Sequence, residues 1–189
     1  MSRALYIHWP FCLKKCPYCD FNSHVRAGVD VARWQDALLA DMRHEAVGAG
    51  GEALDSVFFG GGTPSLMPPA LVGTLLEEAQ RLWGFAPEIE ITLEANPSSV
   101  EAANFAALAS AGVNRVSLGL QALDDATLRF FGRLHNVEES LAALETAQEA
   151  LGGSASTSSM RGRARRRTPG GGSWRPPWAS APGTCRSTS

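Results

Sequence analysis

The sequence predicts an α/β fold built from four βα units around a parallel sheet. Short segments rich in β-branched and aromatic residues alternate with longer segments whose apolar residues recur at helical spacing. Charge divides the chain near Gly152. Of 17 basic and 19 acidic residues, residues 152–189 hold seven Arg and no acid, which leaves 10 basic and 19 acidic residues in residues 1–151. We therefore predict a folded domain over residues 1–151 and a disordered basic tail over residues 152–189, in which Gly, Ser and Pro fill half of the positions.

The predicted elements follow one another as strand and then helix. The predicted strands are the short apolar segments Ala4–His8, Asp55–Gly60, Ile89–Ala95 and Arg115–Leu120. The predicted helices are Val31–Val47, Pro69–Leu82, a third that Pro97 opens and that runs to Ala111, Asp124–Phe131 and Val137–Leu151. Four strands are too few to close a barrel of the usual kind. We therefore expect an incomplete barrel.

Polar and glycine residues follow each predicted strand. A loop with three cysteines follows the first strand, Gly60-Gly61-Gly62-Thr63 follows the second, Glu94 and Asn96 stand near the end of the third, and Gln121 follows the fourth. Because parallel strands end at one edge of the sheet, these residues are predicted to share one mouth.

Cys12, Cys16 and Cys19 offer three thiolates within eight residues. A structural zinc ion needs four ligands and would require His8 or His24 as the fourth, since Cys185 lies in the tail. An iron–sulfur cluster accepts three protein thiolates and keeps one iron open. We favour the cluster over zinc, and either of these over an accidental grouping.

The motifs around this loop resemble those of a known family. Cys12-Leu-Lys-Lys-Cys16-Pro-Tyr-Cys19, with Gly60-Gly-Gly-Thr-Pro64, Leu93-Glu-Ala-Asn-Pro97 and Arg115-Val-Ser-Leu-Gly-Leu-Gln121, is similar to the radical S-adenosylmethionine (SAM) superfamily. The resemblance implies a (β/α)6 barrel, here incomplete. It also implies a [4Fe–4S] cluster on Cys12, Cys16 and Cys19, whose open iron chelates SAM.

The resemblance also assigns residues to SAM. Gly61, Gly62 and Thr63 would hold its amino acid end, Tyr6 would lie near the same groups, and Tyr18 would lie near the adenine. Gln121 and Arg133 correspond to residues near SAM, including a second SAM in the oxidase of this family. Glu94 suits an ammonium or a ribose hydroxyl. The residues alone also permit a glycine turn, a rim carboxylate at Glu94, core aromatics at Tyr6 and Tyr18, and a solvated helix-end charge at Arg133.

Together with Tyr6-Ile-His-Trp-Pro-Phe-Cys12, the three later motifs resemble the branch that contains oxygen-independent coproporphyrinogen III oxidase and the HemW-type heme chaperone. The oxidase carries a further Cys two residues after the third, where this chain has Asp20 and Phe21. The resemblance therefore favours a chaperone that carries heme as cargo to an acceptor protein, including a membrane-associated one. An oxidase of porphyrin biosynthesis and an inactive cluster-binding fragment remain the alternatives. Catalytic residues and oligomeric state are left open.

The tail is predicted to arise from a shifted reading frame. Ser156–Arg161 can be encoded by TCG ACC TCA TCT ATG CGC, and reading from the third base gives Asp-Leu-Ile-Tyr-Ala, which resembles the fifth strand of the family. The remaining strands and the heme-binding C-terminal domain would then be missing.

Composition also excludes some classes of partner. The net charge of −9 over residues 1–151 argues against nucleic acid. No apolar run approaches the roughly 20 residues of a membrane span, and no signal peptide precedes Ala4–His8. A cytoplasmic protein with reduced thiols is expected.

Overall fold

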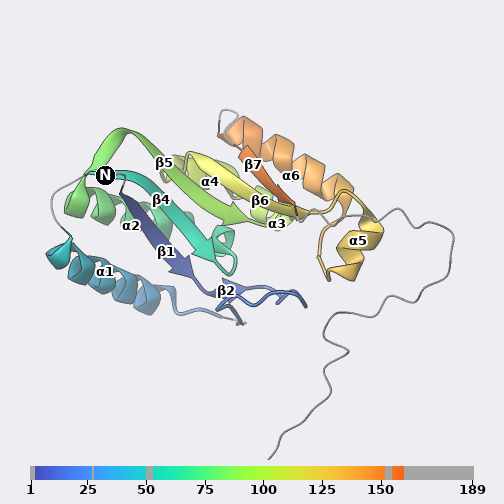
Figure 1. The fold of residues 1–189 in the computed structure, drawn as a ribbon, viewed down its shortest axis with the longest axis horizontal. Helices are drawn as coiled ribbons and strands as arrows, with labels where there is room; N and C mark the ends of the chain where they lie inside the picture. The colour runs from blue at the N-terminus through green and yellow to red at the C-terminus, as the bar shows by residue number, and fades with distance from the viewer. Residues whose placement is uncertain (1–2, 27, 50–52, 152–154, 160–189) are drawn as a thin grey trace, which may run out of the picture.

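A single parallel sheet organises the chain (Figure 1). The computed structural model describes residues 3–26, 28–49, 53–151 and 155–159. Its five-stranded sheet has the order β1-β4-β5-β6-β7, and every neighbouring pair is parallel. The strands are β1 (Ala4–Trp9), β4 (Leu54–Gly61), β5 (Phe85–Ala95), β6 (Arg115–Gln121) and β7 (Ala155–Ser159). The α/β fold with a parallel sheet is thus confirmed.

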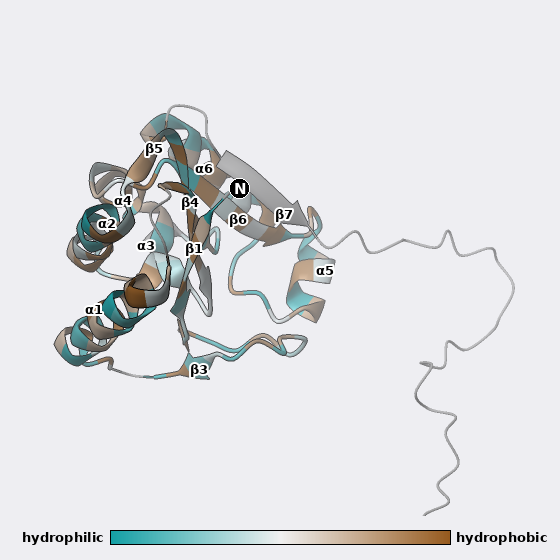
Figure 2. Ribbon diagram, turned by 60° about the vertical axis from the view of Figure 1, so that its left-hand side comes forward, coloured by the Kyte–Doolittle hydropathy of each residue, from teal (hydrophilic) through white to brown (hydrophobic). Residues whose placement is uncertain are grey.

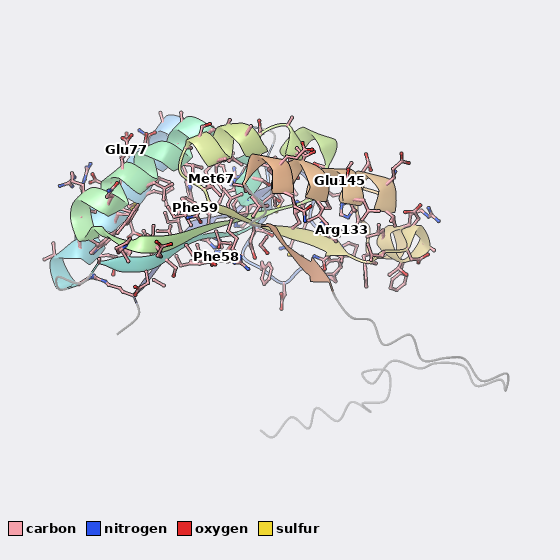
Figure 3. All side chains as sticks on the ribbon, turned by 90° about the horizontal axis from the view of Figure 1, so that it is seen from above. Phe58, Phe59, Met67, Glu77, Arg133 and Glu145 are labelled. Atoms are coloured by element: carbon pink, nitrogen blue, oxygen red, sulfur yellow. The ribbon has the colours of Figure 1, made fainter. Side chains whose placement is uncertain are left out.

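Helices cover one face of this sheet (Figure 3). They are α1 (Val31–Gly48), α2 (Pro69–Trp83), α3 (Ser99–Ala102), α4 (Phe105–Ser110) and α6 (Val137–Ala150). The short helix α5 (Asp125–Phe130) lies beyond the ends of the strands (Figure 1). A 3-10 turn, η1 (Pro64–Leu66), follows β4, and two short strands, β2 (Phe11–Cys12) and β3 (His24–Val25), pair beside the main sheet. Along the covered face α1 contacts α2, α2 contacts α4, and α4 contacts α6.

The hydrophobic core lies between the sheet and these helices. Strand residues alternate in direction, so Phe59 faces the helices and is fully buried, whereas its neighbour Phe58 faces the other side (Figure 3). Figure 2 shows brown, hydrophobic stretches both in the central strands and in the helices beside them. In β6, Val116, Leu118 and Leu120 are buried in this core. The side chains of the residues between them therefore lie on the opposite face of the sheet.

The third predicted helix is interrupted. Instead of one helix from Pro97 to Ala111, the chain forms α3 and α4. Between them the backbone N–H of Asn104 bonds the carbonyl of Glu101 at 3.0 Å, in a tight turn. The break allows both the Glu101 carboxylate and the Phe105 ring to be buried.

Five residues of the predicted disordered tail form a strand, which corrects that prediction. β7 pairs with β6 in a register that sets Val116 opposite Ala155 and Gln121 opposite Ser159. The physical reason is that the pairing uses backbone groups, which a prediction from side-chain composition does not consider. The rest of the tail, residues 160–189 with Cys185, lies outside the described residues. Within the described ranges, no helix is long and apolar enough to cross a membrane.

Candidate functional site

An open pocket of about 370 Å³ lies at the carboxyl ends of the strands. It is lined by residues from the loop after β1, from the ends of β4, β5 and β6, and from the segment after α5. Ten of the eleven predicted site residues line it: Cys12, Cys16, Tyr18, Cys19, Gly61, Gly62, Thr63, Glu94, Gln121 and Arg133. Tyr6 is absent from this lining.

The cysteine loop is held to the end of the sheet by backbone hydrogen bonds and aromatic packing. The ring of Phe11 packs edge-on against Trp9 and Trp34, with ring centroids 5.0 and 5.2 Å apart, so the start of the loop is fixed against α1. The Cys19 N–H bonds the carbonyl of Cys16 at 3.0 Å. Lys15 closes the loop, because its Nζ donates to the carbonyls of Phe21 and Ser23 at 3.3 and 3.4 Å.

The three thiols suit an iron–sulfur cluster by their chemistry. Cys12, Cys16 and Cys19 are all free and half-buried, and they line one pocket. Soft thiolates on one loop are the usual ligands of such clusters. Within residues 3–159 as described, no three His, Cys, Asp or Glu side chains form a ready site for a single metal ion. His8, one of the two predicted fourth zinc ligands, already uses both ring nitrogens, with Asn22 O at 3.0 Å and Tyr6 Oη at 3.3 Å.

The glycine stretch after β4 brings two backbones together. A Cβ on Gly62 would lie 2.8 Å from the carbonyl oxygen of Phe11 and 3.0 Å from Cys12 Sγ. Gly61 has φ +115°, a conformation that favours glycine. The N–H of Gly62 bonds Trp9 O at 2.7 Å, and that of Thr63 bonds Phe11 O at 2.9 Å. The glycines are expected to let the backbone approach a ligand closely. In the structure they first of all let the segment after β4 approach the cysteine loop.

Glu94 is a half-buried carboxylate at the end of β5. Burial raises its pKa above the usual range, and a hydrogen bond from the Gly61 backbone partly offsets this effect. Tyr6 lies close enough for Glu94 to add to the rise in pKa that burial of the phenol causes. Tyr6 itself is 56% exposed and stacks on Phe58, on the face of the sheet away from the helices.

Arg133 connects three parts of the site. Its Nη2 donates to Asn96 Oδ1 at 2.5 Å and to Gly119 O at 2.9 Å, at the ends of β5 and β6. Its Nη1 reaches Cys16 Sγ at 3.4 Å and Tyr18 Oη at 3.3 Å. Burial raises the pKa of Tyr18, and the nearby guanidinium opposes that rise. The interpretation of Arg133 as a solvated charge at a helix end, which the residues alone permit, is therefore wrong.

Gln121 ends β6 in an unusual conformation. Its φ is +69°, and among the described residues it alone combines a side chain with positive φ. Such backbone strain is typical of positions that serve a site. Here it accompanies the turn that carries the chain out of the sheet at the rim of the pocket.

Two further residues serve the site without being predicted for it: Asn96, which lines the pocket, and Glu101, which is buried next to Asn96. The sequence places Asn96 only at a strand end and indicates no role for Glu101. The carboxylate of Glu101 is 2% exposed and accepts hydrogen bonds from Ser65, Ser98 and Asn96. The spacing Ser98-x-x-Glu101 is that of a capping box, which predicts a surface helix start. The pattern therefore predicts the hydrogen bond between Ser98 and Glu101, but not the burial of Glu101.

Comparison with known proteins decides the family. A model of the Radical SAM superfamily matches residues 6–160. This chain belongs to the radical SAM superfamily. Radical S-adenosyl methionine domain-containing protein 1, mitochondrial, of Bos taurus is 43% identical over 159 residues, which are 84% of this chain and 36% of that protein. The heme chaperone HemW of Escherichia coli (strain K12) is 42% identical over 145 residues, which are 76% of this chain and 38% of HemW.

A solved radical SAM enzyme shares the fold. Coproporphyrinogen III oxidase (HemN) from Escherichia coli superposes with a TM-score of 0.73 and 30% identity, over 84% of this chain and 36% of that one. This chain thus spans less than two fifths of the length of each of these relatives. The radical SAM fold expected from the motifs is confirmed for the part that the chain contains.

Proposed function

We propose that this chain acts as a [4Fe–4S]- and SAM-binding protein of the heme chaperone type, which binds heme and transfers it to an acceptor protein. One observation carries the proposal: three free thiols, the glycine stretch, Glu94 and Arg133 line one pocket at the carboxyl ends of the strands. The similarity to HemW supports the chaperone branch. Since the chain spans 38% of HemW, heme binding and transfer belong to the proposal.

In this proposal Cys12, Cys16 and Cys19 hold the cluster. When bound, the cluster supplies one-electron chemistry and an open iron for the amino acid end of SAM. Thr63 and Glu94 bind the ammonium side, and Glu94 is suited to this role because its half-buried carboxylate lies on the rim between β4 and β6. The Arg133 guanidinium binds the carboxylate side, and Tyr18 and Gln121 line the remaining wall of the pocket.

Anaerobic reconstitution with iron and sulfide tests the cluster. We expect one [4Fe–4S] cluster per chain, measured as iron, sulfide and charge-transfer absorbance. Alanine at Cys12, Cys16 or Cys19 should remove most of that absorbance, whereas Cys185→Ala should keep it. Equal loading of the variant with all three alanines would overturn the assignment. SAM binding to the loaded protein is then measured by equilibrium dialysis.

Oxidase activity is the second candidate, and the structural similarity to HemN favours it. Product analysis with coproporphyrinogen III, beside titration with heme, separates the candidates. Heme binding without decarboxylation supports the chaperone, decarboxylation supports the oxidase, and neither supports an inactive cluster-binding fragment. The acceptor, including a membrane-associated one, is sought by heme transfer to candidate proteins.

Location and reading frame belong to the same proposal. The cytoplasmic location is tested by fractionation, and the bovine relative, which is named mitochondrial, supplies the competing compartment. DNA sequencing across the codons for Ala147–Ser159 tests the shifted frame. One uninterrupted frame would overturn it.

A further inference from the structure

Glu101 is a buried carboxylate surrounded by neutral donors. Its exposure is 2%, and it belongs to α3, from which its carboxylate reaches Ser65 of η1. Its Oε2 accepts from the Ser65 hydroxyl and, at 2.7 Å, from the backbone N–H of Asn96. Its Oε1 accepts from the Ser98 hydroxyl at 3.2 Å and from the Asn96 side-chain amide at 3.4 Å. Burial of a carboxylate is costly, so each of these acceptor positions is constrained.

An ionised carboxylate accepts hydrogen bonds and donates none. The side-chain amide of Asn96 therefore turns its NH2 group toward Glu101, and the same NH2 group reaches Thr63 Oγ1 at 3.3 Å. The amide oxygen is left on the opposite side. There it accepts from Arg133 Nη2 at 2.5 Å.

The Arg133 guanidinium depends on that oxygen for its position. Besides Asn96 Oδ1, its Nη2 has the carbonyl of Gly119, and its Nη1 has Cys16 Sγ and Tyr18 Oη as weaker partners at 3.4 and 3.3 Å. Its Nε is buried and has no partner in the described structure. If Asn96 turned its NH2 group to Arg133, two donors would face each other, and the guanidinium would lose its shortest hydrogen bond.

We propose that Glu101 is a positioning residue, which orients the Asn96 amide and through it holds Arg133 at the cysteine loop for binding of the SAM carboxylate. This inference rests on the proposed function, because it deepens the role given there to Arg133. In this account Glu101 acts through Asn96, to which it is hydrogen-bonded. The competing account is that Glu101 only ties α3 to η1 through Ser65.

Glu101→Gln separates these two accounts. The variant keeps the size of the side chain and one acceptor oxygen, which can still serve the Asn96 backbone N–H and Ser65. Its new NH2 group replaces the acceptor that faces the Asn96 amide. Asn96 then turns its oxygen toward Gln at 101 and its NH2 group toward Arg133. The guanidinium is therefore expected to leave its place at Cys16.

A second substitution should restore the arrangement. In the double variant Glu101→Gln with Asn96→Asp, the carboxylate at 96 accepts both from the amide at 101 and from Arg133. The amide and the carboxylate have then exchanged places, and the net charge is that of the parent chain. Asn96→Asp alone sets two carboxylates against each other and should not reproduce this gain.

The experiment measures the dissociation constant of SAM for the cluster-loaded protein, and the NMR signals of the Arg133 guanidinium in the protein without cluster. We expect Glu101→Gln to weaken SAM binding about tenfold, the usual loss for a hydrogen bond to a charged group, and to average the guanidinium signals. The double variant should recover both. Ser65→Ala, which breaks only the tie to η1, should leave both unchanged.

Each outcome is decisive. Parent-like SAM binding and guanidinium signals in Glu101→Gln, or a loss in Ser65→Ala equal to that in Glu101→Gln, would overturn the positioning role. If Glu101→Gln fails to fold, Asn96→Ala replaces it, since this variant removes the amide oxygen and leaves the Glu101–Ser65 bond. If the parent chain itself fails to bind SAM, the proposed function falls, while the guanidinium signals still test the position of Arg133.

Discussion

The packing around Gly62 leaves no room for a side chain at this position. Its missing Cβ is the space in which the backbone at Phe11 and the thiol of Cys12 lie, at 2.8 and 3.0 Å from the position that a Cβ would take. Backbone atoms have little freedom to give way there. The residue therefore shapes the cysteine loop before any ligand arrives.

We expect Gly62→Ala to destabilise the fold by about 1–3 kcal/mol, the usual cost of overpacking, and to reduce cluster loading and SAM binding together. Chemical unfolding and iron content measure the two effects. Gly73→Ala in α2 is the control, because its Cβ would meet Ala111 at an ordinary 3.9 Å. That variant should gain about 0.5–1 kcal/mol from the helix preference for alanine. Normal cluster loading in Gly62→Ala would contradict this view of the loop.

Glu94 should make stability depend on pH. Burial raises its folded-state pKa above the ordinary 4.5. The folded state thus binds the proton of Glu94 more tightly than the unfolded state does. The contribution of Glu94 to stability is therefore full below pH 4.5 and is lost as pH rises through the folded-state pKa. Glu94→Gln resembles the protonated form. We expect it to match the parent at low pH and to exceed it in free energy of unfolding at neutral pH. Parallel pH profiles would refute this.

At the scale of elements, Glu78 joins the first two long helices. Its carboxylate binds Arg43 of α1 at 2.6 Å and Arg81 of α2 at 2.8 Å. Hydrogen bonds from Arg81 and Arg43 lower its pKa to about 2. A lowered carboxyl pKa gives stability that is present above pH 4.5 and is lost as pH falls toward 2.

Glu78→Gln should therefore lower stability at neutral pH and remove part of its loss in acid. The effect should shrink in high salt, since the arginines are exposed. Thermal unfolding across pH measures it. Glu77→Gln is the matched control, because Glu77 points outward from α2 (Figure 3). An equal change in both variants would show that the link between α1 and α2 adds nothing.

Elements with strong periodicity could be predicted from the sequence, and irregular ones could not. The apolar spacing in α2 locates that helix within one residue at its end, because one face packs on the sheet. β2 and β3 have two residues each, too few to show any alternation. β7 has no apolar residue except Ala155, and its pairing depends on the open edge of β6.

The residues of the candidate site likewise differ in whether the sequence predicts their position. Residues that follow strands, such as Glu94 and Gln121, could be placed at one mouth because parallel strands end together. Arg133 follows a short helix, and only the tertiary structure brings it to Cys16. Asn96 and Glu101 act through side-chain hydrogen bonds, for which spacing in the sequence gives no direction.

For the whole molecule, β7 covers the edge of the more apolar strand β6 and takes its place as the edge strand of the sheet. It pairs with β6 from Val116 to Gln121. An open strand edge offers unpaired N–H and C=O groups to other chains. A chain that stops after Leu151 should therefore self-associate more than a chain that stops after Ser159, which keeps β7. Light scattering at several concentrations measures this, and equal association of the two truncated chains would contradict it.

The order of the strands in the sheet is also their order in the chain, β1-β4-β5-β6-β7. During synthesis on the ribosome, each strand therefore emerges beside a neighbour that is already complete, and none has to wait for a later one to be inserted between them. The residues that line the pocket end at Arg133. A nascent polypeptide can thus complete this site while translation continues, so cofactor insertion need not wait for release of the finished product.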